Sequence, residues 1–500
     1  MLYQNFITLE KRKGVVRMKE KKRMSKLVLF FVVILTMLNI ISPISKAEAK
    51  EKVYQIATDI TFAPFEFQDV NGDFVGIDMD LMAAIAKDQG FKYEMKPLGF
   101  NAAVQALESK QVDAVIAGMS ITDERQMKFD FSEPYFDSGI IMAVDSDNDK
   151  VSSYKDLKGQ KVAVKTGTEG ASFAESIKDK YGFSIVTFDD SANMYEEVRT
   201  GNSVAVFDDY PVLAYGIKQG NGLKIVTDKE AGASYGFAVS KGQNTELLEM
   251  FNTGLANLKA SGEYQEILDK YLETGSDEEA KSGFFGLLKE SFPSLLSGLK
   301  MTLILTVVSL LIATVLGIIF GLLRIAKSKI LRTIAGIYID IFRGTPLIVQ
   351  AFFIYFGIPA ALDFRITAVA AGLITLSLNA GACMAEIVRG GIQSVDKGQM
   401  EAARSLGLPY GKAMRKVVLP QAIQLMIPAF INQFVITLKD TSILSIIGIN
   451  ELTQSGKIII ARNLESFQMW LIVGIMYFIV IMILTKVSNR LERRIKNGQA

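Results

Sequence analysis

The chain has few residues that could perform covalent chemistry. It contains no histidine and a single cysteine, Cys383, which lies inside an apolar run. Histidine is the commonest general base and metal ligand, and zinc clusters need Cys or His, so zinc sites, Cys–His catalysis and disulfides within the chain are excluded. No G-x-x-x-x-G-K-[ST] phosphate loop is present. The remaining carboxylates, cations and amides predict binding by ion pairs and hydrogen bonds, and no metal site.

Several of these polar groups lie inside apolar runs in the C-terminal part. Glu386 and Arg389 are three residues apart, as are Asp340 and Arg343, while Asn379 lies in the middle of a run. Polar groups inside a bilayer are functional candidates by default, so Glu386 and Asn379 are possible pathway residues. Glu386 could equally pair with Arg389 one helical turn away, or lie near the membrane interface. Asp340 with Arg343 is interpreted as a structural pair.

The composition indicates a mixed chain of two or three domains. Of the 500 residues 49% are hydrophobic, and the mean hydropathy of +0.26 is high for a soluble protein and low for a wholly membranous one. The net charge of +2 hides strong segregation of charge along the chain. Because no basic stripe with interleaved aromatic residues occurs, we expect no nucleic-acid partner.

The N-terminus has the pattern of a secretory signal peptide, residues 1–49. A basic stretch at 11–26 precedes an apolar core at 27–41 and the small-residue site Ala47-Glu48-Ala49. An uncleaved anchor helix is the alternative, and the true start codon stays open. In both cases the segment that follows is exported.

Residues 50–275 alternate short apolar strands with amphipathic helical windows. This alternation predicts an α/β fold with largely parallel sheets. The turn-rich segment 130–138 could join two lobes. The predicted strands are 53–58, 114–117, 161–164, 204–206 and 235–239, and the predicted helices are 79–87, 102–108 and 246–260.

Four motifs in this segment carry a family resemblance. They are ATDITFAPFEF (57–67), GMSITDER (118–125), KTGTEG (165–170) and FDDYP (207–211). Their order and spacing resemble those of periplasmic polar amino-acid-binding proteins, particularly the glutamine binders. The resemblance implies a type II binding-protein fold, with lobe one at 50–138 and 234–275, lobe two at 141–232, and closure about a hinge.

The matching positions suit an amino-acid headgroup. A desolvated zwitterion needs a guanidinium for its carboxylate and a carboxylate for its ammonium. Arg125 fits the first role, supported by Ser120 and backbone amides near Gly118. Asp209 fits the second, although its neighbour Asp208 leaves an ambiguity of one position.

The other matching positions suit a side-chain amide. Phe62 and Phe100 would sandwich the aliphatic part of the ligand, unless they are ordinary core aromatics. Asp59 can accept from an amide NH2 while Lys165 donates to the amide oxygen, which favours glutamine over glutamate or asparagine. Glu169 departs from the family, because glutamine binders have Gly there.

Residues 276–290 are predicted to be a linker, and 291–500 a membrane domain of about five spans. The stretch ETGSDEEAKSG is charged and lacks apolar periodicity. Loops that would face the cytoplasm hold 15 Lys or Arg residues and the opposite loops hold 3. By the positive-inside rule the chain begins outside and ends inside the plasma membrane. The predicted spans are 301–323, 334–359, 366–388, 421–438, with continuation to 449 as the alternative, and 469–485.

Further motifs resemble amino-acid permeases of type I ABC importers. They are RGTPLIVQ (343–350), AEIVRGGIQSVDKGQ (385–399), LKDTSILSIIG (438–448) and the basic island EAARSLGLPYGKAMRKVVLP (401–420). The island resembles the EAA coupling loop, whose short helices dock on a separate ATPase in that family. Gly407 would allow the tight turn between the two helices. Glu401, Ala402 and Arg404 would contact the ATPase.

The resemblance also implies partners. Without a phosphate loop this chain holds no cofactor, and ATP and Mg would belong to the cytoplasmic ABC ATPase subunit. Five spans suggest a two-fold permease pair, expected to be a homodimer. The rival classes are an amino-acid-gated receptor or channel, a chemosensory kinase and an extracellular enzyme. They fit less well, because the binding segment is complete before the first span, no TVGYG-like filter occurs, and no nucleophile–base pair is apparent.

Overall fold

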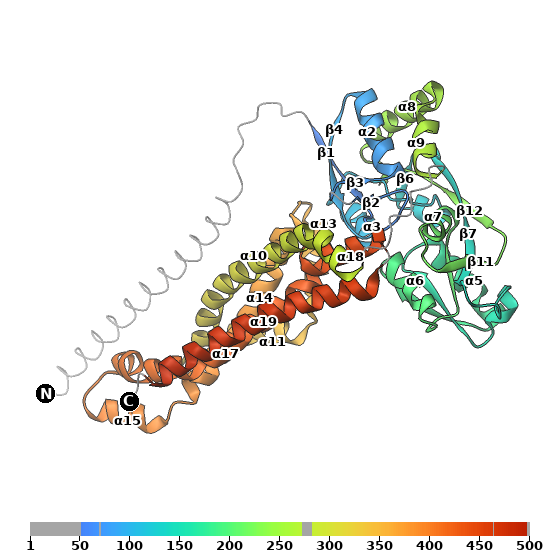
Figure 1. Cartoon of the computed structure of the whole chain (residues 1–500). Helices are drawn as coiled ribbons and strands as arrows, with labels where there is room; N and C mark the ends of the chain where they lie inside the picture. The colour runs from blue at the N-terminus through green and yellow to red at the C-terminus, as the bar shows by residue number, and fades with distance from the viewer. Residues whose placement is uncertain (1–51, 70–71, 273–282, 464, 498–500) are drawn as a thin grey trace. The chain divides into compact units, whose positions relative to one another are not determined.

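The computed structural model describes residues 52–69, 72–272, 283–463 and 465–497. The predicted signal segment 1–49 lies outside these residues, as does the predicted linker up to residue 282. The described chain comprises an α/β domain followed by a helical domain (Figure 1).

The first lobe of the α/β domain is built on a five-stranded sheet. Its order is β4-β1-β5-β13-β6, with β1 parallel to β4 and β5, and β13 antiparallel to its neighbours. Helices pack on the sheet through apolar faces, and Phe237 stacks on Phe251 with ring centroids 4.3 Å apart in that core. The strands are β1 Val53–Thr58, β4 Lys92–Pro97, β5 Ala114–Val115, β6 Phe129–Phe131 and β13 Ala238–Ser240, beside a small hairpin, β2 Phe67–Gln68 with β3 Phe74–Val75. The helices are α2 Ile77–Gln89, α3 Phe100–Glu108, α4 Asp123–Gln126, α8 Thr245–Ser261 and α9 Glu263–Leu272.

The second lobe has its own sheet, of order β11-β7-β10-β8-β9. Strand β8 is parallel to β9 and β10, which matches the expected α/β character. Polar caps start its helices: Thr168 accepts from the N–H of Ala171, and Asp190 from that of Asn193. The strands are β7 Phe136–Asp145, β8 Lys161–Lys165, β9 Ser184–Phe188, β10 Ala205–Asp209, β11 Leu223–Ile225 and β12 Glu230–Tyr235. The helices are α5 Glu169–Tyr181, α6 Ser191–Arg199 and α7 Tyr210–Lys218, with a short 3-10 turn at Tyr154–Leu157.

Two antiparallel strands, β7 and β12, connect the lobes. Tyr235 pairs with Phe136 at one end and Glu230 with Ile140 at the other, and the register shifts between Ala231 and Ser234. The two strands approach closely at glycines: a Cβ on Gly232 would lie 2.6 Å from the Cα of Gly139. A bulge of this kind frees backbone groups from the ladder.

The helical domain contains four long apolar helices. Helix α10 packs along α14, and α14 packs against α17 (Figure 1). Among the described residues, four helical stretches are long and apolar enough to span a membrane, or five if a bent pair forms one span, which agrees with the expectation of about five spans. The bounds are α10 Phe284–Arg324, α11 Lys329–Gly344, α12 Leu347–Phe352, α13 Ile358–Leu362, α14 Ala368–Gln393, α15 Lys397–Ser405, α16 Tyr410–Ala413, α17 Leu419–Asp440, α18 Leu452–Asn463 and α19 Ser466–Asn497. Between them lie π-helical turns at Phe353–Gly357 and Met414–Val418 and a 3-10 stretch at Thr441–Ile447.

Two sequence predictions for this domain are corrected. The predicted span 334–359 is not one straight helix, because the chain bends by 108° between the helical stretches Lys329–Gly344 and Leu347–Leu362. Pro346 lies at this break and has no N–H to continue the helix. The predicted linker was also too long, since helix α10 already begins at Phe284, and Leu287 and Ser291 are buried there.

Candidate functional site

The strands of the two lobes bring charged residues to facing sheet edges. Asp59 directly follows β1, Lys165 ends β8 and Asp209 ends β10. In open α/β sheets ligands bind outside the carboxyl ends of the strands. Three of the predicted ligand residues are therefore placed by the topology of the sheets.

Helix starts and a tight turn place the other predicted residues. Phe100 begins α3, and Arg125 lies in α4, where its N–H donates to the capping Thr122 hydroxyl at 3.3 Å. Gly118 has a φ of +51°, and a Cβ there would lie 2.3 Å from the Phe62 ring. A side chain at 118 would therefore collide with the aromatic wall.

These residues line one narrow cavity between the lobes, with a free volume of about 10 Å³. That is room for roughly one water molecule, so the lobes are closed on each other and must separate to admit a ligand. Asp59 does not line the cavity itself but forms an ion pair with Lys165, which does. The other predicted ligand residues line the cavity. The lining residues are Phe62, Phe100, Ala117, Gly118, Ser120, Arg125, Lys165, Thr168, Glu169 and Asp209.

Asp59 and Lys165 form a buried ion pair across the two lobes, and each side chain is 1% exposed. The other carboxylate oxygen of Asp59 accepts from the N–H groups of Ile60, at 2.6 Å, and Thr61, at 3.1 Å. Burial lowers the pKa of the Lys165 ammonium, but the charge and hydrogen bond of Asp59, together with the charges of Asp208 and Glu66, outweigh burial, and the pKa lies above its usual value. The ammonium also lies 5.0 Å from the centre of the Phe62 ring.

Arg125 forms a second link between the lobes. Its guanidinium donates to the Ser120 carbonyl at 2.8 Å and, across the cleft, to the Gly167 carbonyl at 2.9 Å. It lies over the Phe100 ring, 5.3 Å from its centre. Burial lowers the pKa of Arg125, against the opposite effect of nearby carboxylates such as Glu169.

Asp209 presents a buried carboxylate oxygen, Oδ1, that has no hydrogen-bond partner among the residues that the structure describes. Its Oδ2 accepts from the Tyr235 hydroxyl at 2.6 Å. Burial raises the pKa of Asp209 to about 7, and the charges of Asp208 and Glu169 add to this shift. An orphaned carboxylate oxygen beside a guanidinium is the arrangement that an ammonium–carboxylate ligand would complete.

The side chains of Asp208 and Asp209 lie in different surroundings. The carboxylate of Asp208 accepts from the Tyr195 hydroxyl at 2.7 Å and from the Asp209 N–H at 2.9 Å. Asp208 does not line the cavity, whereas Asp209 does. The geometry therefore favours Asp209, as the sequence interpretation did.

Two side chains of the site were not predicted from the sequence. Tyr235, fully buried on the crossover strand β12, orients Asp209, and its hydroxyl in turn accepts from the Ser138 hydroxyl at 3.0 Å. The carboxylate of Glu169 accepts from the N–H of Ala233 at 3.0 Å and 3.2 Å. The sequence signalled only that Glu169 was unusual.

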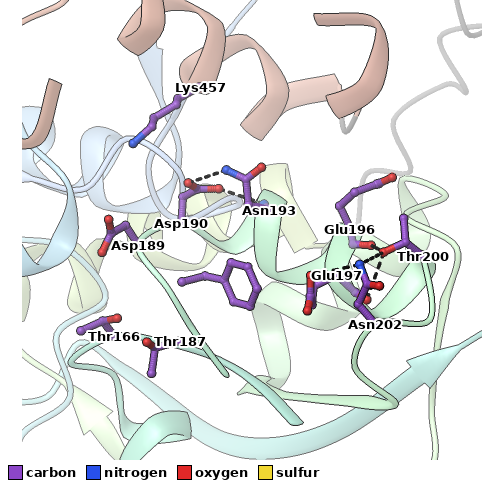
Figure 2. Close-up of a pocket in the computed structure, with 11 residues that line it drawn as sticks. Thr166, Thr187, Asp189, Asp190, Asn193, Glu196, Glu197, Thr200, Asn202 and Lys457 are labelled. Carbon is purple, nitrogen blue, oxygen red and sulfur yellow. Dashed lines mark hydrogen bonds between the residues drawn. The ribbon is translucent and has the colours of Figure 1, made fainter. Parts of the chain in front are cut away.

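A larger hollow lies beside the start of α6, and Thr166, Thr187 and Asp189 are among the residues that line it (Figure 2). Figure 2 shows several of its polar groups bonded to one another. Asp190 caps the helix through Asn193, and the hydroxyl of Thr200 donates to the backbone carbonyl of Glu196 at 2.8 Å. These contacts are those of helix ends, and none of the predicted ligand residues lies there.

The possible pathway residues in the helical domain are engaged in internal contacts. Glu386 pairs with Arg389 at 2.7 Å, the alternative that the sequence left open, and lies 3.7 Å from Arg343. The expected Asp340–Arg343 pair is wrong: among the described residues Asp340 has no ion pair. The amide of Asn379 donates to the Phe342 carbonyl at 3.0 Å, at the bend between α11 and α12.

The basic island 401–420 forms two helical pieces joined at Gly407. Helix α15 ends just before it, and Gly407 has a φ of +84°, which favours glycine. The expected tight turn is thus confirmed. Glu401, Ala402 and Arg404 are exposed on α15, and Ala403 is buried. The second piece runs on through a π-helical turn into α17, so the island has no separate end at its C-terminal side.

Comparison with known proteins matches the two domains separately. Residues 54–274 match the bacterial extracellular solute-binding proteins, family 3, and residues 313–497 match the binding-protein-dependent transport system inner membrane component. The glutamine transport system permease protein GlnP of Escherichia coli K12 is 41% identical over 207 residues, covering 41% of this chain and 94% of that protein. The arginine transport system permease protein ArtQ of Bacillus subtilis is 38% identical over 206 residues, covering 41% and 94%.

Among solved structures, substrate-binding domain 2 of Lactococcus lactis GlnP, in an open conformation, is 46% identical. The match covers 46% of this chain and 100% of that one, with a TM-score of 0.36.

The two family matches and the permease relatives define a class: a multi-pass membrane protein of binding-protein-dependent transport. Within that class the chain belongs to the polar amino-acid ABC importers, with the solute-binding domain and the permease domain fused in one polypeptide.

Proposed function

We propose that this chain is the substrate-binding and permease subunit of an ATP-driven glutamine importer. The observation that carries the proposal is the distribution of charge in the cavity. Arg125 and the orphaned Oδ1 of Asp209 form one charged group around the cavity, and the Asp59–Lys165 pair forms another. The first pair suits an amino-acid headgroup, and the second suits a neutral side chain with both a donor and an acceptor.

A carboxamide matches Asp59 and Lys165 better than a charged group does. When the lobes open, Asp59 becomes an acceptor for the amide NH2, and Lys165 becomes a donor to the amide oxygen. The carboxylate of glutamate would face Asp59, and the guanidinium of arginine would face Lys165, so each would leave a buried like-charge contact. Asparagine is one methylene shorter and would span the two groups less well, which ranks it with glutamate as second.

The relatives named above include one glutamine permease and one arginine permease, so they support amino-acid transport more strongly than glutamine itself. The charge argument therefore carries the choice of substrate. A basic substrate is the competing outcome that any test must include.

We further propose the topology and partners of the importer. The binding domain is exported by the N-terminal signal, and residues 401–420 and the C-terminus are cytoplasmic. The exposed α15 surface of Glu401, Ala402 and Arg404 docks on a separate ATPase subunit, which holds ATP and Mg. Two copies of the chain supply the two halves of the pathway. Substrate capture closes the lobes, and ATP-driven movement of the coupling loops then opens the pathway.

The test is a calorimetric titration of the purified full-length chain in detergent with glutamine, glutamate, asparagine, arginine and lysine. The proposal predicts micromolar or tighter binding of glutamine and at least tenfold weaker binding of the others. Binding of none of these amino acids would overturn the proposed function. Tighter binding of arginine would overturn the choice of substrate alone.

A further inference from the structure

Glu169 lies where the cavity meets the strands that connect the lobes. It is the first residue of α5, directly after the capping Thr168, and its side chain lines the cavity together with Arg125 and Asp209. An acidic residue in the first turn of a helix is favourable in any protein. Helix stability alone, however, requires neither a side chain turned into the cavity nor a partner outside the helix.

The partner of Glu169 is the backbone of the crossover strand β12. Its two carboxylate oxygens lie 3.0 Å and 3.2 Å from the N–H nitrogen of Ala233. Ala233 lies where the β7–β12 register shifts, between Ala231 and Ser234. The bulge frees this N–H from the strand ladder, and Glu169 supplies its acceptor.

The same carboxylate acts on both headgroup residues. Its charge raises the pKa of Asp209, after burial and Asp208, and it opposes the lowering of the pKa of Arg125 by burial. The headgroup residues Arg125 and Asp209 and their neighbour Glu169 therefore bring two carboxylates and one guanidinium to the cavity lining, while Lys165 is balanced by Asp59. An ammonium placed beside Oδ1 of Asp209 would relieve the repulsion between the two carboxylates.

We propose that Glu169 is a positioning and specificity-determining residue that makes the α-ammonium of the ligand obligatory and holds strand β12 in the closed arrangement. This inference rests on the proposed function. The carboxylate of Glu169 thus has two effects. It favours a cation beside Asp209, and it holds the N–H of Ala233 on strand β12. Ligands with an amide side chain but no α-amino group are rejected, because they leave two carboxylates facing each other.

Two substitutions separate the two roles. Glu169→Gln removes the charge but keeps an acceptor for the Ala233 N–H, and Glu169→Ala removes both. The matched control is Glu175→Gln on the same helix, because Glu175 is exposed and paired with Lys178 away from the cavity. Each variant of the full-length chain in detergent is titrated with L-glutamine and with glutaramic acid, which is glutamine without its α-amino group.

The expected result is a loss of glutamine affinity of about tenfold in Glu169→Gln, which corresponds to about 1.4 kcal/mol, without a matching loss for glutaramic acid. Glu169→Ala should lose a further fewfold and release glutamine faster, because the acceptor for Ala233 is gone. The control should match the wild type. If all three variants bind glutamine like the wild type, or lose glutamine and glutaramic acid affinity equally, the inference is wrong.

The pH profile gives a readout that a purely structural role would not change. Asp209 is faced by Asp208, Glu169, Arg125 and Tyr235. Removing the charge of Glu169 lowers the pKa of Asp209, so the rise of glutamine affinity with pH should move to lower pH in Glu169→Gln. An unchanged profile would contradict the inference. A wild-type chain that binds no amino acid would instead refute the proposed function, and the two failures are thereby distinguished.

Discussion

Removal of one hydroxyl, in Tyr235→Phe, tests how the connecting strands support the headgroup site. The Tyr235 hydroxyl donates to Asp209 at 2.6 Å. The ring of Tyr235 packs against Phe65 and Phe136, with centroid distances of 5.1 Å and 5.8 Å, and a phenylalanine ring would keep these contacts. A hydrogen bond to a charged group contributes about 1.5–3 kcal/mol. The substitution should therefore weaken glutamine binding by about ten- to a hundredfold.

The pH dependence sharpens this prediction. In the proposed function, glutamine binding requires the ionised form of Asp209. Burial raises the pKa of Asp209 to about 7, and the Tyr235 hydrogen bond acts in the opposite direction. Affinity in the wild type should thus rise between about pH 6 and 8. In Tyr235→Phe the pKa of Asp209 rises further, so the increase should shift to higher pH.

Tyr195→Phe is the matched control for Tyr235→Phe. Tyr195 makes the same kind of bond, at 2.7 Å, to Asp208, which does not line the cavity. The control should retain glutamine affinity within about threefold and show no upward shift. Calorimetric titration of the full-length chain from pH 5.5 to 9 measures both effects. Equal losses in the two variants, or an unshifted profile in Tyr235→Phe, would refute the reasoning.

Four further outcomes are expected. Lys165→Met should destabilise the closed arrangement of the lobes by about 3–5 kcal/mol, since it orphans the buried Asp59 there, and adding Asp59→Asn should restore much of the melting temperature of the ligand-free protein; no recovery would contradict this. Gly407→Pro should abolish uptake with unchanged glutamine binding, because the φ of +84° is closed to proline; unaltered uptake would refute the coupling role. Gln350→Leu should lower the melting temperature and uptake but leave glutamine binding unchanged, because the Gln350 amide donates to the Phe342 and Thr345 carbonyls at the bend between α11 and α12. A variant with the wild-type melting temperature and uptake would contradict this. Because the pKa of Asp209 is raised, the folded, ligand-free protein binds more protons than the unfolded chain between about pH 4 and 7, and the contribution of Asp209 to stability falls as pH rises through that window. In Asp209→Asn, denaturant titration should therefore show a free energy of unfolding that changes less with pH than in the wild type. An unchanged dependence on pH would contradict this.

The sequence could predict the parts of the site that follow directly from strand ends and local motifs. Asp59, Lys165 and Asp209 directly follow or end their strands, so their meeting at one cleft follows from an α/β fold. Tyr235 could not be found this way, because a tyrosine in a strand of small residues has the pattern of an ordinary core aromatic. Its bond to Asp209 depends on how the second crossover strand returns to the cleft.

In the helical domain, the bend between α11 and α12 was not predicted, because residues 334–359 are apolar over most of their length. The signal was present in Gly344-Thr345-Pro346, a breaker sequence inside an apolar run. The partner of Glu169 could not be predicted from the sequence either, because it is the N–H of Ala233, which a bulge in a distant strand frees. Such long-range backbone irregularities have no local signature.

The central claim is that one chain both selects glutamine and moves it across the membrane. The most direct test deletes the chain's gene in its own host and measures uptake of radiolabelled glutamine after complementation with the wild type or with Arg125→Ala. The account predicts that deletion abolishes high-affinity uptake, that the wild type restores it and that Arg125→Ala does not. Full uptake with Arg125→Ala, or unchanged uptake after deletion, would contradict the account.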